Sequence, residues 1–334
     1  MNTNLRGRHF VSLKDYSRED LETILNVGFD LKTRLSVGER PHLLADKVLG
    51  MLFCYASTRT RVGFETAMDH LGGHAQYYAP EQLQLGTGRD TWVDTAHVLS
   101  RFLDGIMIRL VKVPGVWDLK YGEGHNILKI LASHSRVPVI NACDDQEHPC
   151  QVMADLMTLR EKFGHEGYKK KKVSLVWVCS TKGLAPTGIP HDMALVAGKL
   201  GMKLTLAYPE GFDLDKQYID EGMKLAKESD GTIEIVHDIN EAVKDASAIY
   251  AKGWGAPFMS TEEDAQRRKS LKHWRIEKKH LDIAAEDVVF MNAMPLEREI
   301  DATSEVVDGP SSIIYDQAEN RLHAQKAILS LIMG

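Results

Sequence analysis

The sequence predicts an α/β protein with two doubly wound domains, each built around a parallel sheet. Short apolar segments typical of buried strands alternate with amphipathic segments typical of helices, which favours parallel strands covered on both faces. This alternation breaks near residue 150 and then restarts. The length of 334 residues also exceeds what one small core usually holds and suggests about two domains.

The first half begins with a clear helix signal. Ser17 followed by Asp20 has the pattern of a capping box, and apolar residues recur at helical spacing as far as Leu31. The later elements that we expect in this half are strands at residues 48–54, 75–78, 105–110 and 137–141, and helices at about residues 62–71 and 91–103. The strand segments are nearly continuous apolar runs, as expected where both faces of a sheet are covered.

The second half repeats the pattern after a long amphipathic helix expected at residues 150–163. The basic run at 169–172 is interpreted as a solvated turn before a strand. Strands are expected at residues 173–178, 204–208, 233–236, 248–251 and 288–292, with a final helix at 317–333. We therefore expect a second sheet of parallel strands in this half.

Composition excludes several classes of protein. Lys and Arg number 41 and Asp and Glu 47, so the formal net charge is −6, which argues against nucleic acid or an anionic membrane as a partner. No apolar run approaches the roughly 20 residues of a membrane span, and residues 1–8 lack the apolar stretch of a secretory signal. The four cysteines form no Cys-x-x-Cys pair, so we expect a reduced, cytoplasmic protein without a structural zinc site.

Three polar segments follow expected strands, where ligands bind in open parallel sheets. The segment 57–61, Ser-Thr-Arg-Thr-Arg, lies where a helix should begin. Free backbone N–H groups, hydroxyls and guanidinium groups at such a place suit a phosphate. The alternative is a capped helix with solvated arginines, but burying two arginines beside a strand is costly without an anion.

The other two segments are Arg109, at the end of an apolar strand, and residues 148–151, His-Pro-Cys-Gln. A histidine beside a helix N-terminus tends to stay neutral and can donate a hydrogen bond to a carbonyl oxygen. His148 could equally be a structural residue. Together the three segments predict a phosphate clamp beside a site that polarises a carbonyl.

These residues also resemble a known family. Residues 57–61, with 64–65 and 71–73, resemble the carbamoyl-phosphate signature of the aspartate/ornithine carbamoyltransferases, and residues 148–151 resemble that family's second signature. Segments at 84–86, 94–96, 98–101 and 316–321 match in the same order. The resemblance therefore covers essentially the whole chain.

The resemblance implies a domain plan and a reaction. Residues 1–148 would bind carbamoyl phosphate, residues 149–312 would bind an amine acceptor, and a C-terminal helix in residues 313–334 would pack back on the first domain. The reaction needs no metal or cofactor, because a neutral amine attacks the carbonyl carbon and phosphate leaves. Fixed positive charge would stabilise the oxyanion and the leaving group. Family members are trimers with active sites at subunit boundaries, so we expect a homotrimer.

The resemblance further implies roles for individual residues. The implied carbamoyl-phosphate site consists of Ser57, Thr58, Arg59, Thr60, Gln84, Arg109, His148 and Gln151. Arg109, His148 and Thr60 would polarise the carbonyl oxygen, and Gln151 would hold the carbamoyl amide. Gln84 would reach into the neighbouring subunit's site. Arg298 would keep a guanidinium on the carbamoyl-phosphate side and joins Arg109, His148 and Gln151 in the catalytic set.

The acceptor site has diverged from its relatives. The implied acceptor-binding residues are Lys252, Trp254, Asn292, Met294 and Pro295. Ornithine enzymes carry His-Cys-Leu-Pro near this point, whereas Ala293 stands here in place of the cysteine, which disfavours plain ornithine. The segment around Lys252 is most similar to N-acylornithine carbamoyltransferases, whose crossing loop knots the second domain. Residues 183–190 are a candidate counterpart of that loop.

A second departure leaves the acceptor open. Glu297, Glu299 and Asp301 stand where the N-acylornithine enzymes have a basic stretch. If one of these carboxylates faces the acceptor, a cationic or N–H-rich group is favoured; otherwise they form a solvated face. Lys252 is a candidate for an acceptor carboxylate. An N-acylornithine or a small compound such as ureidoglycine fits these features equally.

Three other classes of protein are alternatives to a carbamoyltransferase. A nucleotide-binding oxidoreductase would carry Gly-x-Gly-x-x-Gly, and the glycines at 183 and 188 lack that spacing. A metal-dependent hydrolase could use Asp144, Asp145 and Glu147 beside His148, but a second set of ligands is missing from the sequence. A catalytically altered relative that only binds carbamoyl phosphate, or regulates through it, remains the alternative to an enzyme.

Overall fold

The computed structural model describes residues 4–79, 90–112, 118–180 and 186–334. These residues form two compact units: unit 1 is Met1–Met157 with Glu319–Gly334, and unit 2 is Thr158–Ala318. We expected the chain to divide after residue 148 and to return at residue 313. The units divide later because the long helices α5 (Pro149–Phe163) and α13 (Ile314–Met333) each continue past those points.

Unit 1 contains a four-stranded parallel sheet with the order β2-β1-β3-β4. The strands are β1 (Val48–Phe53), β2 (His74–Tyr78), β3 (Gly105–Arg109) and β4 (Val139–Cys143). Leu49 pairs with Gly105, and Ile106 pairs with Val139. The chain moves from β1 outward to β2 and then crosses to β3, so the order reverses between β1 and β3. Ligands bind at such a reversal point in open α/β sheets.

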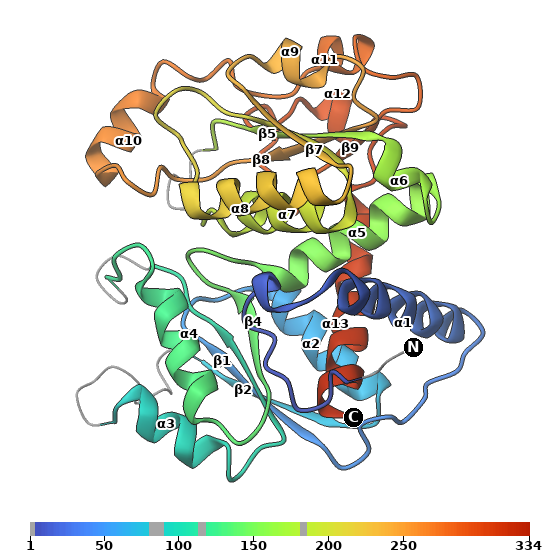
Figure 1. Ribbon diagram of the computed structural model, residues 1–334, viewed down its shortest axis with the longest axis vertical. Coiled ribbons are helices and arrows are strands. Elements are labelled where there is room, and N and C mark those ends of the chain that lie inside the picture. The colour runs from blue at the N-terminus through green and yellow to red at the C-terminus, as the bar shows by residue number, and fades with distance from the viewer. Residues whose placement is uncertain (1–3, 80–89, 113–117, 181–185) are drawn as a thin grey trace. The chain divides into compact units, whose positions relative to one another are not determined.

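Helices cover both faces of this sheet (Figure 1). They are α1 (Arg18–Ser36), α2 (Thr58–His70), α3 (Trp92–Leu99), α4 (Glu123–His134), the start of α5, and most of α13, with a 3-10 helix at Leu13–Asp15. Capping boxes at Ser17 and Thr91 begin α1 and α3. Helix α4 was not predicted from the sequence; it follows Gly122, which has a left-handed conformation and provides no side-chain cap.

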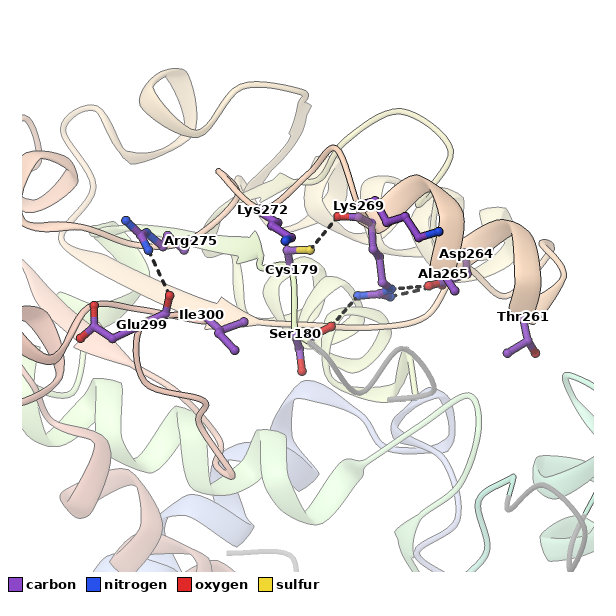
Figure 2. Close-up of a pocket in the computed structure, with 11 residues that line it drawn as sticks. Cys179, Ser180, Thr261, Asp264, Ala265, Lys269, Lys272, Arg275, Glu299 and Ile300 are labelled. Carbon is purple, nitrogen blue, oxygen red and sulfur yellow. Dashed lines mark hydrogen bonds and ion pairs between the residues drawn. The ribbon is translucent and has the colours of Figure 1, made fainter.

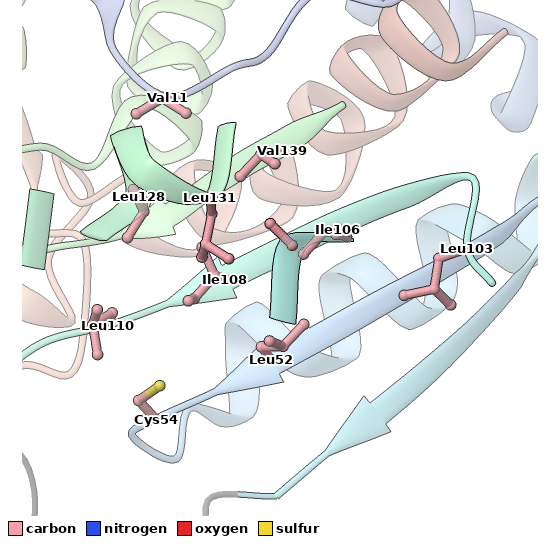
Figure 3. Close-up of a cluster of buried hydrophobic side chains, with 11 residues drawn as sticks. Val11, Leu52, Cys54, Leu103, Ile106, Ile108, Leu110, Leu128, Leu131 and Val139 are labelled. Atoms are coloured by element: carbon pink, nitrogen blue, oxygen red, sulfur yellow. The ribbon is translucent and has the colours of Figure 1, made fainter. Parts of the chain in front are cut away.

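The core of unit 1 lies between the sheet and the helix pair α3 and α4. Leu52, Ile106 and Ile108 from the strands pack with Leu128 and Leu131 from α4 (Figure 3). The opposite face carries α13 in close contact, since a Cβ on Gly105 would lie 2.8 Å from Met333 Sδ. Burial on both faces explains why β1 and β3 are almost entirely apolar, whereas the edge strand β2 is partly exposed and carries polar residues.

Unit 2 contains a five-stranded parallel sheet with the order β7-β6-β5-β8-β9. The strands are β5 (Lys172–Trp177), β6 (Lys203–Ala207), β7 (Thr232–Val236), β8 (Ala248–Lys252) and β9 (Val289–Met291). The order reverses between β5 and β8, so the second expected ligand position lies at the carboxyl ends of these two strands. Both parallel sheets were predicted, and the fold class is confirmed.

The helices of unit 2 lie on both faces of its sheet, with α7 and α8 on one face and α9, α11 and α12 on the other (Figure 1). Their bounds are α6 (Gly167–Lys170), α7 (Gly188–Leu200), α8 (Lys216–Glu228), α9 (Ile239–Val243), α10 (Thr261–Arg268), α11 (Lys278–Asp282) and α12 (Ser304–Val307). The basic run expected as a solvated turn partly forms α6, and Lys169 is buried there. Part of the candidate knot loop, residues 181–185, lies outside the described residues.

Within the described part of the chain, no helix combines the length and apolar character needed to cross a membrane.

Candidate active site

The N-terminus of α2 lies directly after β1, at the reversal point of the unit 1 sheet. Ser57 is the N-cap, but within the described part of the chain its side chain makes no capping bond to the helix. Its hydroxyl instead donates to Thr60 Oγ1 at 3.0 Å. The first turn of α2 therefore keeps backbone N–H groups available to an anion, and the helix dipole adds positive potential there.

Three guanidinium groups from distant parts of the chain lie near this turn. Arg59 belongs to α2, Arg109 ends β3, and Arg321 is buried on α13. Burial, together with the charge of Arg109, lowers the pKa of Arg59. Burial lowers the pKa of Arg321 to about 10, with further lowering by Arg109 and Arg59 that nearby Cys150 and Asp155 oppose. The three cations are close enough to destabilise one another's charge.

No ion pair within the described residues compensates these three arginines. Arg321 donates from Nη1 to Gln151 Oε1 at 2.6 Å and from Nη2 to Thr60 Oγ1 at 3.0 Å. Arg109 makes a long bond of 3.5 Å from Nη1 to the Ala142 carbonyl, and its buried Nε has no hydrogen-bond partner among the described residues. Partly buried, crowded cations of this kind are costly unless an anion binds between them.

Arg321 was missed as a site residue by the sequence analysis. It lies at the end of the matching segment 316–321, so the signal was present, but the segment gives no reason to place it beside Thr60 and Gln151. The contact between residues 261 positions apart is made by the return of α13 to unit 1. Arg321 fixes the side-chain oxygens of two predicted ligands and adds positive charge behind them.

His148 is placed by a buried polar network in the segment that joins β4 to α5. Asp144, with no exposed surface, accepts through Oδ1 from the N–H groups of Gln146 and Glu147 at 2.8 and 2.6 Å. Its Oδ2 lies 2.7 Å from His125 Nδ1 and accepts from Asn141 Nδ2 at 2.9 Å. The segment leading to His148 is therefore fixed by one carboxylate.

A second carboxylate ties the same segment to the N-terminal part of the chain. Glu147 accepts from Ser12 Oγ at 2.6 Å and from Leu13 N at 3.0 Å. Burial opposes protonation of His125, but the hydrogen bond and charge of Asp144 and the charge of Glu147 outweigh it, so the pKa of His125 is raised. Asp144 and Glu147 thus accept hydrogen bonds that hold the loop in place. These contacts do not support the alternative of a metal-dependent hydrolase. Among the described residues, no group of three or more acidic, histidine or cysteine side chains is arranged to hold a metal ion.

Asp145 gives this loop a predictable pH dependence. Burial, and then the charge of Asp144, raise its pKa from 3.8 to about 6, against hydrogen bonds from the Gly122 and His125 backbone. A carboxyl group whose pKa rises on folding takes up a proton on folding, so the free energy of unfolding falls as pH rises from about 4 to 6. We expect Asp145→Asn to flatten this fall by about 2 kcal/mol, measured by urea unfolding at pH 4.5 and 6.5. An unchanged slope in the variant would contradict the assignment.

Unit 2 brings most of the predicted acceptor residues together at its own reversal point. A small cavity of about 30 Å³ is lined by Ser180, Lys252, Gly253, Asn292, Met294, Pro295 and Asp301. Ser180 follows β5 and Lys252 ends β8, so the two flank the reversal. Asn292 is held by its Nδ2 bond to the Ala251 carbonyl at 3.0 Å. Its Oδ1 accepts from Met294 N at 2.7 Å, which fixes the segment that lines the cavity.

Two of the three acidic residues near the acceptor segment, Asp301 and Glu299, have different surroundings. Asp301 is buried and lines the cavity with Lys252, and its Oδ2 accepts from Glu297 N at 3.0 Å. Glu299 is exposed and accepts from Ser304 N at 2.7 Å. The structure therefore selects Asp301 as the carboxylate beside Lys252. A cation and an anion at one small site suit an acceptor with both charges, as in an amino acid.

Three predicted site residues, Trp254, Arg298 and Gln84, are not among the described residues that line this cavity. Trp254 has no exposed surface: its Nε1 donates to the Phe212 carbonyl and its own carbonyl accepts from Trp177 Nε1. It is a core residue, so we remove it from the acceptor set. Arg298 is exposed and forms a two-pronged ion pair with Asp308 at 2.6 and 2.7 Å. Its guanidinium is thus engaged within unit 2. Gln84 lies outside the described residues.

Comparison with known proteins identifies the family. The model of the aspartate/ornithine carbamoyltransferase carbamoyl-P binding domain matches residues 8–161, and that of the Asp/Orn binding domain matches residues 171–332. The chain belongs to the aspartate/ornithine carbamoyltransferase family. It is an enzyme of the carbamoyltransferase class, as the sequence predicted.

Relatives of this carbamoyltransferase match along its full length. The anabolic ornithine carbamoyltransferase of Pyrococcus furiosus is 41% identical over 100% of this chain and 99% of its own. The ornithine carbamoyltransferase of Symbiobacterium thermophilum is 39% identical over 99% of this chain and 100% of its own. The matches thus include archaeal and bacterial ornithine enzymes.

Solved structures match both branches of the family. The structure of the Pyrococcus furiosus ornithine carbamoyltransferase has a TM-score of 0.87 and 40% identity, covering 99% of this chain and 98% of that one. An acetylornithine transcarbamylase complexed with acetylcitrulline has a TM-score of 0.88 and 31% identity, covering 98% and 99%. The predicted family is confirmed; the roles of individual residues stay predictions.

Proposed function

We propose that this protein transfers the carbamoyl group of carbamoyl phosphate to the amine of a small amino-acid-like acceptor and releases phosphate. The observation that supports this most strongly is the group of uncompensated cations Arg59, Arg109 and Arg321 beside the uncapped start of α2. A doubly charged phosphate is the ligand whose binding offsets their mutual repulsion.

The proposed reaction divides between the two units. In unit 1, the first turn of α2 and Arg59 hold the phosphate, and Arg109 with His148 polarises the carbonyl oxygen. Gln151, fixed by Arg321, positions the carbamoyl amide. In unit 2, Lys252 and Asp301 hold the charged groups of the acceptor. The neutral amine nitrogen then bonds to the carbonyl carbon, the carbon–oxygen bond to phosphate breaks, and the leaving phosphate takes the amine proton.

Two physical effects would accelerate this transfer. Fixed guanidinium groups stabilise the oxyanion of the tetrahedral intermediate and the departing phosphate without reorganisation. Binding both reactants removes much of the entropic barrier to their meeting. The residues act by charge and position, so the proposal requires no metal or cofactor. We further propose a cytoplasmic homotrimer in which Gln84 completes a neighbouring site, on the family resemblance alone.

The acceptor is proposed to be an N-acylornithine or a small compound of the ureidoglycine type. Ala293 removes the cysteine that ornithine enzymes carry, while Asp301 supplies a carboxylate beside Lys252. The test is a screen of ornithine, N-acetylornithine, N-succinylornithine and ureidoglycine that follows phosphate release from carbamoyl phosphate. Turnover with the acylated ornithines alone would reject ureidoglycine. Carbamoyl-phosphate binding without turnover of any amine would favour the alternative of a regulatory or binding protein.

Lys252→Met is expected to raise the KM for the acceptor about tenfold or more, because an ion pair to a carboxylate in a confined site is lost. The KM for carbamoyl phosphate should not change. Initial-rate kinetics with each substrate varied in turn measure both. Lys172→Met is the matched control, since Lys172 begins β5 and so lies at the opposite end of the strands from Lys252. Equal effects of the two substitutions would contradict the assignment of Lys252.

A further inference from the structure

A second, larger cavity opens beside the acceptor site within unit 2. It has a volume of about 630 Å³ and lies between the end of β5, helix α10 with the segment after it, and the loop at Glu299 and Ile300 (Figure 2). This volume is in the range of sites for small organic molecules. None of the described residues of the proposed carbamoyl-phosphate site lines it.

One wall of this cavity is a rigid ion pair. Arg268 bonds to Asp264 through both Nε and Nη2, and these two side chains are nearly fully buried. Arg268 also donates to the Ser180 and Trp254 carbonyls at 3.1 and 2.6 Å. The charges of Arg268 and Asp264 therefore cancel, and the pair fixes the shape of the wall.

Glu299 is the other carboxylate that lines the cavity, and it too has hydrogen-bond partners of its own. Glu299 accepts a hydrogen bond from Ser304 N, and this bond with that from the Ser304 side chain lowers the pKa of Glu299. Arg275 donates from Nη1 to the Glu299 carbonyl at 3.0 Å and from Nε to Glu277 at 2.7 Å. Neither carboxylate lining the cavity is thus directed to the neighbouring lysines.

Lys269 and Lys272 supply the excess charge. Both line the cavity, and neither forms an ion pair with any carboxylate in the described ranges of the chain. Among the described residues, four cations and two anions line the cavity, which gives a formal charge of 4 − 2 = +2 before the ion pair of Arg275 with Glu277, which lies outside the lining, is counted. A cavity of this size with unneutralised lysines at its edge suits an anionic organic group.

The cavity adjoins the acceptor site at Ser180, which lines both. A ligand held by Lys252 and Asp301 can therefore extend past Ser180. The 30 Å³ cavity alone has room for about one water molecule. The remainder of a larger acceptor needs another compartment, and this one adjoins it.

We propose that this cavity receives a carboxylate-bearing extension of the acceptor, and that Lys272, assisted by Lys269, selects acceptors with that extra negative charge. The inference rests on the proposed function, because the extension belongs to the molecule that is carbamoylated. It assigns acceptor specificity to the segment after α10, outside the residues that the sequence analysis considered.

The test compares N-succinylornithine, which carries an extra carboxylate, with N-acetylornithine, which does not. Wild-type protein should show a kcat/KM at least about fivefold higher for the succinyl compound, through KM. Lys272→Glu should abolish this preference and leave the KM for carbamoyl phosphate unchanged. The preference should also weaken as ionic strength rises, since partly exposed charge pairs are screened by salt. Equal kcat/KM values for the two compounds in the wild-type protein, or a preference that survives Lys272→Glu, would overturn the inference.

Two variants serve as controls. Lys224→Glu reverses the charge of an exposed lysine on α8 that does not line the cavity, and it should leave the preference intact. Ala265→Trp fills the cavity from the exposed face of α10 without touching a lysine, and it should lower kcat/KM for the succinyl compound more than for the acetyl compound. An equal effect on both compounds would contradict the cavity as the compartment for the extension.

Calorimetry separates this inference from the proposed function. N-succinylornithine is titrated into the protein with saturating carbamoyl phosphate. Binding that is lost in Lys272→Glu, without turnover of this or any other tested amine in the wild-type protein, would support the cavity and overturn the proposed transfer reaction. Turnover of other amines without any binding of the succinyl compound would overturn the cavity and leave the transfer reaction standing.

Discussion

Arg59→Ala is expected to lower the affinity for carbamoyl phosphate by about a hundredfold or more while leaving the fold intact. A guanidinium group that meets a phosphate in a partly buried site makes charge-assisted bonds of roughly 1.5–3 kcal/mol each. The native structure loses little, because Arg59 lies near Arg109 and both are cations. Isothermal titration with carbamoyl phosphate measures the loss, and thermal unfolding should show an equal or higher midpoint.

Arg61→Ala is the matched control for this prediction. Arg61 lies two residues after Arg59 in α2, bonds to Glu65 at 3.0 Å and covers the Tyr77 ring at 4.0 Å. These contacts hold it on the surface, so the same loss of charge should leave carbamoyl-phosphate affinity within about threefold of the wild-type value. Equal losses for the two variants would mean that net charge, rather than a phosphate contact, explains the effect.

Asp144→Ala is expected to lower both stability and kcat. It removes the acceptor for the backbone N–H groups of Gln146 and Glu147 and for Asn141 Nδ2, and it leaves His125 without its 2.7 Å partner. Buried donors left unpaired cost about 1–3 kcal/mol each, so a loss of about 3–5 kcal/mol is expected from urea unfolding. Because the same contacts position His148, kcat should fall at least tenfold in protein that remains folded.

The role of Asp144 is separated from general destabilisation by Asp104→Ala. Asp104 accepts from Val48 N at 2.8 Å and pairs with Lys47. It lies just before β3, at the opposite end of the strands from Asp144. Its loss should lower stability without lowering kcat. Asp144→Asn should recover part of the kcat, because an amide oxygen can still accept from the loop. An unchanged kcat in folded Asp144→Ala protein would contradict the positioning role.

The sequence was sufficient to predict the sheets because most of their strands are buried on both faces; the edge strands β2 and β7 are the partly exposed exceptions. Strands buried on both faces are largely apolar and carry the same signal wherever they lie. The first strand, for example, has five fully buried positions after Val48. Helices with a side-chain cap, such as the one that begins at Ser17, were equally visible. Helix α4 was not, because it begins after a left-handed glycine rather than a capping side chain.

Trp254 shows where local similarity was insufficient. It lies beside Lys252 in a segment that resembles an acceptor loop, and an exposed tryptophan there would be a reasonable ligand. The Trp254 ring is buried in the core. Its centroid lies 6.0 Å from that of the Tyr208 ring, and its Nε1 donates to the Phe212 carbonyl at 3.1 Å. Burial of an aromatic ring depends on which neighbours the fold supplies, and these come from elements far away in sequence.

The sequence by itself determined the family, the two parallel sheets, and the candidate residues for a phosphate site, since each depends on short segments. Only the tertiary structure decided which distant charges meet. Arg321 reaches Thr60 and Gln151 because α13 returns to unit 1, and Asp301 lies with Lys252 because the loop after β9 passes the end of β8. Electrostatic interactions between charges depend on their distance and burial, and neither quantity is encoded in a local stretch of sequence.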